Sequence, residues 1–323
     1  MTTTDTHLAT AGERAAAAGL GMRIYRFLKA VPTWVLWFIV MIWSIPTLGL
    51  LVNSFRTRDA QRASGWWTAF TSGTEGWTID NYVDVLGAEA TGGLWNGLMN
   101  SFAIAIPATI IPIAIAAFAA YAFAWMDFRG REWLFIGTVS LMAIPLQMAL
   151  IPLLLVFSTG AEATIPFVDY TIRLLPDFDL AGQTTAVWLT HTGFGLPFAI
   201  FLLHNYISGL PRDLFESAFI DGANHFTIFW RLVVPLSVPV LAAFAIFQFL
   251  WTWNDYLIAL TMIGGNREAL PATVVIASLA GEFGLREHLL SAGAFVQAFV
   301  PIIVFFSLQR YFVRGILAGS VKG

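Results

Sequence analysis

Six long apolar stretches, separated by shorter charged segments, limit what this chain of 323 residues can fold into. Each holds about 20 residues with few charges, the length that a helix needs to cross a bilayer core. Hydrophobic residues make up 58% of the chain and charged residues 11%, a balance outside the range of soluble domains. Because a helix satisfies its own backbone groups in lipid, we predict an all-α polytopic membrane protein with six transmembrane helices. The predicted spans are residues 31–53, 95–124, 133–157, 184–204, 234–258 and 290–309.

These stretches divide the chain into two tails, a first span with its outer loop, and a core. The fourth span contains His191, Thr, Gly and Pro197, so we expect it to face other helices rather than lipid. The predicted regions are a cytoplasmic tail (1–30), a first transmembrane helix (31–53), an extracytoplasmic loop (54–94), a core domain with five transmembrane helices (95–309) that includes the connection 205–233, and a cytoplasmic tail (310–323).

The distribution of Lys and Arg predicts which ends of the spans face the cytoplasm. With both termini and the connections 127–132 and 205–233 inside, the inner segments hold eleven Lys or Arg and the outer segments six. Because such residues gather on the cytoplasmic side, we predict a multi-pass protein of the cell (inner or plasma) membrane with both termini cytoplasmic. The outer segments hold thirteen acidic residues against seven inside, which favours a soluble partner on the outer side.

Several kinds of chemistry have no residues to support them. The chain has no Cys, and its five His residues lack the spacing of metal ligands, so we expect no metal site and no cofactor. No phosphate loop of the Gly-x-x-x-x-Gly-Lys-Ser/Thr type occurs, so the sequence offers no ATP site of that kind. The net charge of −3 is small and no basic run occurs, so nucleic acid is not an expected partner, whereas membrane lipid is.

The connection between the fourth and fifth spans carries the most specific signal. Residues 210–235 read LPRDLFESAFIDGANHFTIFWRLVVP, a charged, helix-forming insertion between two apolar stretches. Helical spacing places Phe215 above Phe219 and Phe226 above Trp230, so apolar side chains are predicted to project into the cytoplasm. Such a face favours docking of a protein partner; the alternative is an amphipathic loop folded onto its own bundle.

Glu216-Ser217-Ala218, followed by Gly222 after three residues, resembles the EAA loop of binding-protein-dependent ABC importers. The family pattern is Glu-Ala-Ala, three residues, then Gly, and Ser217 departs from it by one small residue for another. The resemblance implies the type I ABC importer permease fold and an ATPase docked on this loop. Glu216 would pair with a basic residue of the ATPase, and Gly222 would allow close backbone approach. The implied docking residues are Phe215, Glu216, Ser217, Ala218, Phe219, Asp221, Gly222, Ala223 and Phe226.

The end of the chain supports the same family. Leu308 to Gly315 and the terminal Ala318-Gly-Ser-Val-Lys-Gly are similar to the tail of maltose-type sugar permeases. In those transporters the tail of one permease subunit reaches the interface between the two ATPases. The resemblance therefore implies ATPase contacts here, and ordinary fraying of a chain end is the alternative. The implied tail contacts are Ser320, Val321, Lys322 and Gly323.

Polar residues near the predicted spans are candidates for a gate or pore. Trp253-Asn254-Asp255-Tyr256 resembles a Trp-Asn-acidic pattern at the outer end of the fifth helix in this family, and Gln147 lies between Pro145 and Pro152. Asp255 at a water boundary is an equally simple interpretation of that pattern. In maltose-type systems the sugar contacts within the membrane come mainly from the sister subunit, so no sugar-binding residues are assigned.

Together these features predict a transmembrane permease subunit of an ATP-driven ABC importer, without enzyme activity of its own. Its expected partners are two ATPase subunits, a sister permease subunit and an extracytoplasmic sugar-binding protein. The resemblance favours a carbohydrate, such as an α-glucoside or maltodextrin, with glycerol phosphate as the alternative solute. A secondary transporter or an intramembrane enzyme would need mid-membrane ionisable groups or clustered catalytic residues, and neither is evident in the sequence.

Overall fold

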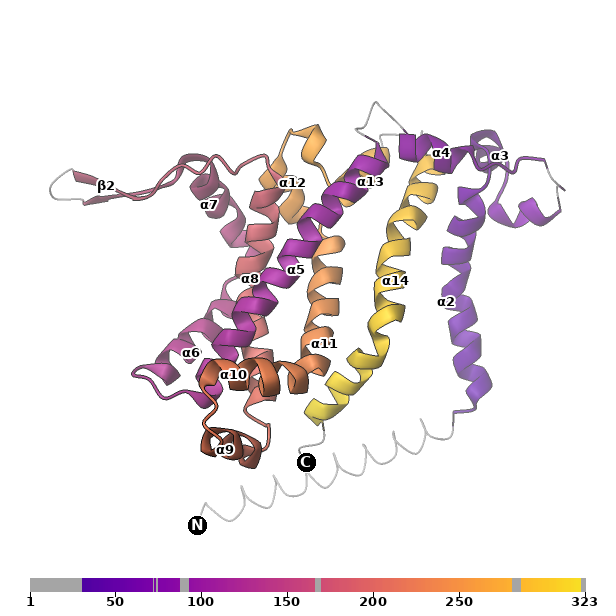
Figure 1. The fold of residues 1–323 in the computed structure, drawn as a ribbon. Helices are drawn as coiled ribbons and strands as arrows, with labels where there is room; N and C mark the ends of the chain where they lie inside the picture. Colours follow the sequence, from indigo (N-terminus) through magenta and orange to yellow (C-terminus); the bar gives the residue numbers. More distant parts are fainter. Residues whose placement is uncertain are drawn as a thin grey trace, which may run out of the picture.

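Helices make up most of the described chain in the computed structural model (Figure 1). The structure describes residues 31–71, 73, 75–87, 93–165, 170–280 and 286–320, with the backbone alone at 163–165, 170 and 310–320. Five helices within these residues are long and apolar enough to cross a membrane. They are α2 (Thr33–Ser54), α5 (Leu94–Trp125), α8 (Thr184–Ile207), α11 (Val234–Trp253), which continues α10 (His225–Ile228), and α14 (Glu287–Ser320).

The third predicted span, residues 133–157, is not one straight helix. It is divided into α6 (Arg131–Ser140), a short 3-10 turn η3 (Leu141–Ala143) and α7 (Leu146–Thr159), and the two parts meet at an angle of 101°. The break falls at Pro145, whose ring disfavours helical backbone in the residue before it, and Ile144 is indeed extended with ψ of 117°. The bent pair accounts for a sixth span in the membrane only if both parts are counted together.

The fifth span, predicted as residues 234–258, ends earlier than expected. Helix α11 ends at Trp253, and a separate helix α12 (Leu257–Ile263) follows after a turn. The turn is fixed by Asp255, whose carboxylate accepts hydrogen bonds from the backbone N–H groups of Ile258 (3.4 Å) and Ala259 (3.0 Å). An acidic side chain that caps a new helix start explains why the apolar stretch does not continue as one helix.

Helices α5, α8 and α11 form the centre of the bundle. Of the candidate spans, α8 has the largest buried share, 56% of its most apolar window, as its polar composition predicts. At the meeting point of the three helices lies Gln248, fully buried, whose Nε2 donates to the carbonyl oxygens of Ala108 (3.1 Å) and His191 (3.3 Å). One amide group thereby joins α11 to both neighbours.

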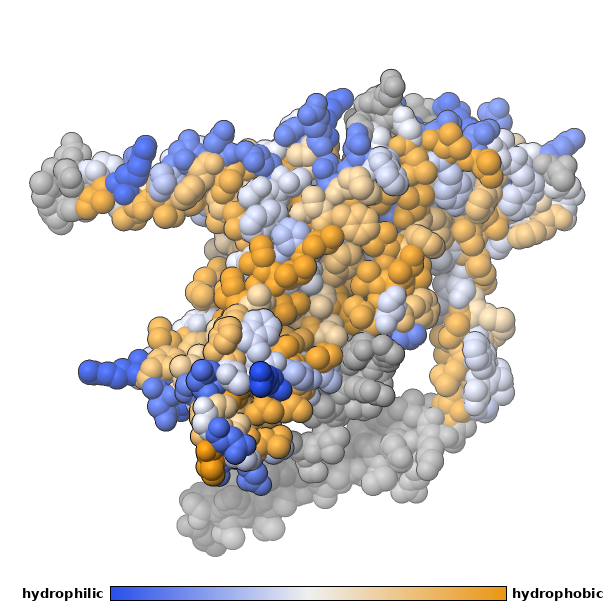
Figure 2. All heavy atoms as spheres, in the orientation of Figure 1, coloured by the Kyte–Doolittle hydropathy of each residue, from blue (hydrophilic) through white to orange (hydrophobic). Residues whose placement is uncertain are grey.

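Short elements cover one end of the bundle, opposite the end that holds α9 (Arg212–Ile220) and α10 (Figure 1). They lie in the connections between the apolar stretches, and the antiparallel hairpin is the described part of the fold that departs from an all-α protein. Figure 2 shows a hydrophobic belt between more hydrophilic ends, as a membrane protein requires. The short elements are α3 (Arg58–Ala63), η1 (Trp66–Phe70), α4 (Asp80–Gly87), β1 (Ala161–Ile165), β2 (Tyr170–Leu175), η5 (Arg267–Ala269) and α13 (Ala272–Leu279).

Replacement of Gly195 by Val is expected to destabilise the bundle, because a Cβ at this position lies 2.6 Å from Oε1 of Gln248. The amide would have to leave its two carbonyl partners, at a cost of about 1–3 kcal/mol. The matched control is Gly193→Val on the same helix, where a Cβ has no neighbour within 4 Å. The midpoint of thermal unfolding in detergent should fall for Gly195→Val alone, and equal midpoints would contradict this account.

Candidate functional site

The connection between α8 and α11 forms a helical elbow at the same end of the bundle as the loop 127–130 (Figure 1). We use the name elbow for residues 208–233. It contains α9 (Arg212–Ile220), a turn, α10, and a π-helical segment η4 (Phe229–Val233) that runs into α11. Pro211 stands just before α9, where a helix start needs no backbone N–H, so proline is accommodated at this position.

The turn after α9 requires glycine. Gly222 has a φ of +81°, and the N–H groups of Gly222 and Ala223 donate to the carbonyls of Phe219 (3.0 Å) and Ala218 (2.9 Å). This pair of bonds is the Schellman motif, which satisfies the last carbonyls of a helix through one left-handed residue. Asn224 then caps the next helix, since its Oδ1 accepts from the N–H of Thr227 at 2.8 Å. The sequence therefore builds a tight, well-bonded corner between α9 and α10.

Most of the residues predicted to dock a partner lie on the surface of this corner. Apolar side chains stand among them: Ile220 is 85% exposed and Phe226 66% exposed. Within the described part of the chain Glu216 has no ion-pair partner. A surface with exposed apolar groups beside an unpaired carboxylate fits a protein-binding surface. The exposed members of the predicted set are Glu216, Ser217, Phe219, Asp221, Gly222 and Phe226, and Ala218 and Ala223 are half-buried.

The prediction that Phe215 projects from the elbow is wrong. Its side chain is fully buried and stacks on the indole of Trp125 at the end of α5, with ring centroids 3.7 Å apart and an angle of 11° between the planes. The indole Nε1 of Trp125 also donates to the carbonyl of Ile207 at 3.2 Å. Phe215 thus fastens α9 to its own bundle, which leaves Phe219 and Phe226 as the exposed aromatic residues of the predicted set.

The three candidate gate residues do not share one environment. Gln147 is exposed in the first turn of α7, and Asn254 is exposed with its Nδ2 bonded to the carbonyl of Leu250 at 2.8 Å. Asp255 is mostly buried, and its Oδ2 lies 3.6 Å from Nε2 of the fully buried His191. The structure therefore separates Asp255, which ties α12 to α8 and α11, from the other two.

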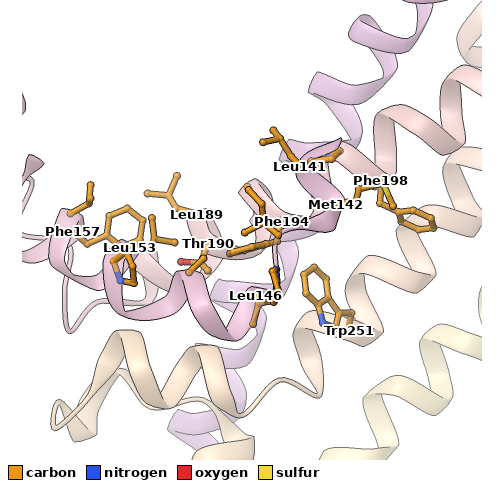
Figure 3. Close-up of a pocket in the computed structure, with 17 residues that line it drawn as sticks. Leu141, Met142, Leu146, Leu153, Phe157, Leu189, Thr190, Phe194, Phe198 and Trp251 are labelled. Carbon is orange, nitrogen blue, oxygen red and sulfur yellow. The ribbon is translucent and has the colours of Figure 1, made fainter. Parts of the chain in front are cut away.

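An apolar pocket of about 790 Å³ lies beside the broken third span (Figure 3). It is bounded by η3, the break at Pro145, α7, α8 and Trp251 of α11, so it exists because the chain bends at Pro145. Thr190 contributes a hydroxyl, which donates to the carbonyl of Ala186, and Trp251 separates the pocket from His191 through a ring contact at 4.8 Å. The lining is Leu141, Met142, Ile144, Pro145, Leu146, Ala149, Pro152, Leu153, Val156, Phe157, Leu189, Thr190, Gly193, Phe194, Pro197, Phe198 and Trp251.

The predicted tail contacts fall at the edge of the described chain. Ser320 is the last residue of α14, described by its backbone, and Val321, Lys322 and Gly323 lie outside the described residues, as does the N-terminal tail 1–30. Sequence reasoning also missed Tyr121 and Trp125 as contacts of the elbow. Their spacing with Phe118, at i, i+3 and i+7, is the signal that marks one helix face.

Comparison with known protein families identifies the family of this chain. Residues 112–318, which include the elbow and four of the five long helices at least in part, match the model of the binding-protein-dependent transport system inner membrane component family. The chain belongs to this family. Membership makes it a membrane-embedded component of a transport system, and the elbow with Glu216 and Gly222 is the part that the sequence had already singled out.

Individual relatives cover nearly the whole chain. The osmoprotective compounds uptake permease protein GgtD of Synechocystis sp. is 50% identical over 88% of this chain and 89% of its own length. The alpha-glucoside transport system permease protein AglG of Rhizobium meliloti is 38% identical over 88% of this chain and 95% of its own. In the crystal structure of a bacterial ABC transporter that imports alginate, one chain shares the fold, with a TM-score of 0.63 and 19% identity over 90% of this chain and 97% of that one.

Removal of the Phe215 ring should loosen the elbow, whereas loss of an exposed side chain on the same helix should not. We expect Phe215→Ala to cost about 3–5 kcal/mol of local stability, the usual cost of a buried Phe-to-Ala change. Ile220→Ala is the matched control, with a change within about 0.5 kcal/mol. Limited proteolysis at the elbow should speed up for Phe215→Ala only, and equal cleavage of the two variants would contradict the assigned burial.

Proposed function

We propose that this chain is a membrane-spanning subunit of an ATP-driven ABC importer for a carbohydrate, and that a separate ATPase docks on its elbow. The single observation that carries the proposal is the corner at Gly222, where an exposed carboxylate, a left-handed glycine and exposed apolar side chains lie together on a family-typical motif. Docking of a rigid partner needs an open backbone at the contact, and a Cβ at Gly222 has no neighbour within 4 Å. Glu216 supplies the charge for a salt bridge with that partner.

The partners follow from what one such subunit lacks. It has no phosphate loop, so ATP hydrolysis belongs to separate ATPase subunits, of which we propose two, one for each permease subunit. A sister permease is supported by α2, whose apolar window is only 6% buried. An extracytoplasmic binding protein is supported by the acidic excess of the outer segments. We further propose that Ser320 to Gly323 contact the ATPases, as the resemblance to maltose-type permeases implies.

The proposed orientation places the elbow and both termini in the cytoplasm. The elbow and the loop 127–130 lie at one end of the bundle, and the hairpin, α3, α4 and α13 lie at the other (Figure 1). This arrangement agrees with the excess of Lys and Arg in the segments assigned to the inside. An ATPase can reach Glu216 only if that end faces the cytoplasm.

A carbohydrate is the proposed solute because the relatives are named for such solutes. Their names include alpha-glucoside, arabinooligosaccharides and diacetylchitobiose, beside the osmoprotective compounds of the 50% identical relative. We propose an α-glucoside or a short oligosaccharide, with glycerol phosphate as the alternative. We propose that the pocket of Figure 3 lines the path of the solute. Its Phe194, Phe198 and Trp251 offer aromatic faces on which the apolar face of a sugar ring can stack.

The docking proposal predicts that Glu216→Ala combined with Gly222→Asp releases the ATPase. Loss of the ion pair and a new carboxylate at the contact should weaken binding about 10- to 100-fold. The matched control is Glu132→Ala with Gly130→Asp, since Gly130 is also exposed, has a φ of +83° and belongs to the loop 127–130, which lies at the same end of the bundle. The ATPase that copurifies with the tagged chain is measured, and its equal retention by both double variants would reject the elbow as the docking site.

The solute proposal predicts that the cognate binding protein melts at a higher temperature with maltose or a maltodextrin than with glycerol phosphate, because a bound ligand stabilises the folded state. Uptake of the stabilising sugar should then fall in Gly193→Trp, which places a bulky ring in the pocket, and persist in Gly137→Trp. Both glycines have open space around them, and only Gly193 lines the pocket. Stabilisation by glycerol phosphate alone would reject the sugar, and unchanged uptake in Gly193→Trp would reject the pocket as the passage.

A further inference from the structure

One face of α5 carries three aromatic residues in register with the three parts of the elbow. Phe118, Tyr121 and Trp125 stand at positions i, i+3 and i+7 of the helix, so they share one side of it. We call this set the aromatic stripe. Trp125 contacts α9, Tyr121 contacts α10, and Phe118 contacts the π-helical segment η4. Helix α5 is not adjacent to the elbow along the backbone, because the elbow connects α8 with α11.

The contact of the stripe with α9 is the tightest of the three. The indole of Trp125 lies nearly parallel to the ring of Phe215, and the same indole donates its N–H to the carbonyl of Ile207 at the end of α8. One side chain therefore holds both the helix that leads into the elbow and the first helix of the elbow. Phe215 is among the largest fully buried side chains in the described structure.

The other two contacts reach the second half of the elbow. The hydroxyl of Tyr121 and Nδ1 of His225 are 2.9 Å apart, a hydrogen bond between α5 and the first residue of α10. The ring of Phe118 stacks on Phe229 with centroids 4.2 Å apart and an angle of 18°. Phe229 opens η4, and a π-helical turn inside a longer helix is often found at functional positions. The widened turn and the stack on Phe118 occur at the same residue.

We propose that the aromatic stripe couples the elbow to α5, so that displacement of the elbow by a docked ATPase moves α5 together with α8 and α11. This inference rests on the proposed function. A force on α9 and α10 reaches α8 and α11 along the backbone, whereas it reaches α5 through side-chain contacts. The three central helices share the Gln248 amide, so they must move as one unit if that buried group is to keep its partners. The stripe therefore consists of positioning residues, which act on the transport step through the elbow.

The test uses the complete transporter, purified through a tag on this chain with its ATPase and reconstituted with its binding protein and solute. Trp125→Ala removes the stack and the hydrogen bond, Trp125→Phe keeps an aromatic ring, and Tyr121→Phe removes only the hydroxyl. Phe123→Ala is the matched control, because Phe123 lies on the same end of α5 and its ring contacts are with Phe128 and Phe135, which lie outside the elbow. Three quantities are measured: ATPase retained, ATP hydrolysed, and solute transported per ATP.

We expect every variant to retain the ATPase and hydrolyse ATP. Solute transported per ATP should fall about 10-fold in Trp125→Ala and about 3-fold in Tyr121→Phe, in line with the usual strength of an aromatic pair and of one hydrogen bond. Trp125→Phe should recover to within about 2-fold of wild type, and Phe123→Ala should keep the wild-type ratio. The solute concentration at half-maximal transport should not change in any of them, since the stripe does not touch the solute.

Three results would overturn the coupling role. The first is a wild-type ratio in both Trp125→Ala and Tyr121→Phe. The second is a loss of transport that only matches a loss of bound ATPase, which would make the stripe a purely structural support. The third is an equal fall in Phe123→Ala. If Trp125→Ala fails to fold, Tyr121→Phe and His225→Ala decide, and their effects should be less than additive because both remove the same bond. Failure of the proposed function itself would look different, since wild type would then carry no ATPase.

Discussion

The meeting of α5, α8 and α11 is the contact on which the other parts of the structure depend. Lipid is as apolar as a leucine side chain, so burial of apolar surface does little to hold membrane helices together, and close packing with a few polar bonds must do so. Both occur here: Gly195 allows Gln248 to lie against α8, and the Gln248 amide donates to two neighbouring helices. Small buried residues of α5 let the backbones approach, namely Ala105, Ala108, Ala116, Ala117 and Ala120.

The pocket and the peripheral helix α2 take their form from this centre. The third span cannot lie flat along it, because Pro145 forces an extended residue before α7 and the two halves diverge by 101°. A hollow between the bent pair and α8 is the geometric consequence. Helix α2, in contrast, packs little against this centre. It is apolar on all sides, and large side chains such as Trp37 and Trp43 are exposed. A helix of this kind is stable in lipid or against another subunit, and it adds little to the central packing.

The features that the sequence could predict are those with a local physical cause. Spans follow from apolar length, and the corner at Gly222 follows from a residue type that alone adopts positive φ without strain. Pro145 predicts a kink, but the angle of 101° between α6 and α7 depends on how the following helix packs. The prediction of an exposed Phe215 is wrong because periodicity tells which residues share a helix face and does not tell which face meets the core. Its partner Trp125 lies 90 residues earlier in the chain, and the stack that joins them is a property of the folded bundle.

If the elbow docks an ATPase as proposed, it has to satisfy two requirements that oppose each other, and the nine residues of α9 can meet both. A docking surface must stay exposed, which costs packing, while a part that transmits force must be held firmly by its own subunit. The helix divides these tasks between its faces: Phe215 is fully buried against Trp125, and Ile220, five residues later and on a different side, is 85% exposed. Exposed apolar groups alone would give a flexible, sticky loop, and burial of all of them would leave nothing for a partner to hold. The inward anchor at Phe215 is therefore a condition for the outward surface at Glu216 and Gly222 to do mechanical work.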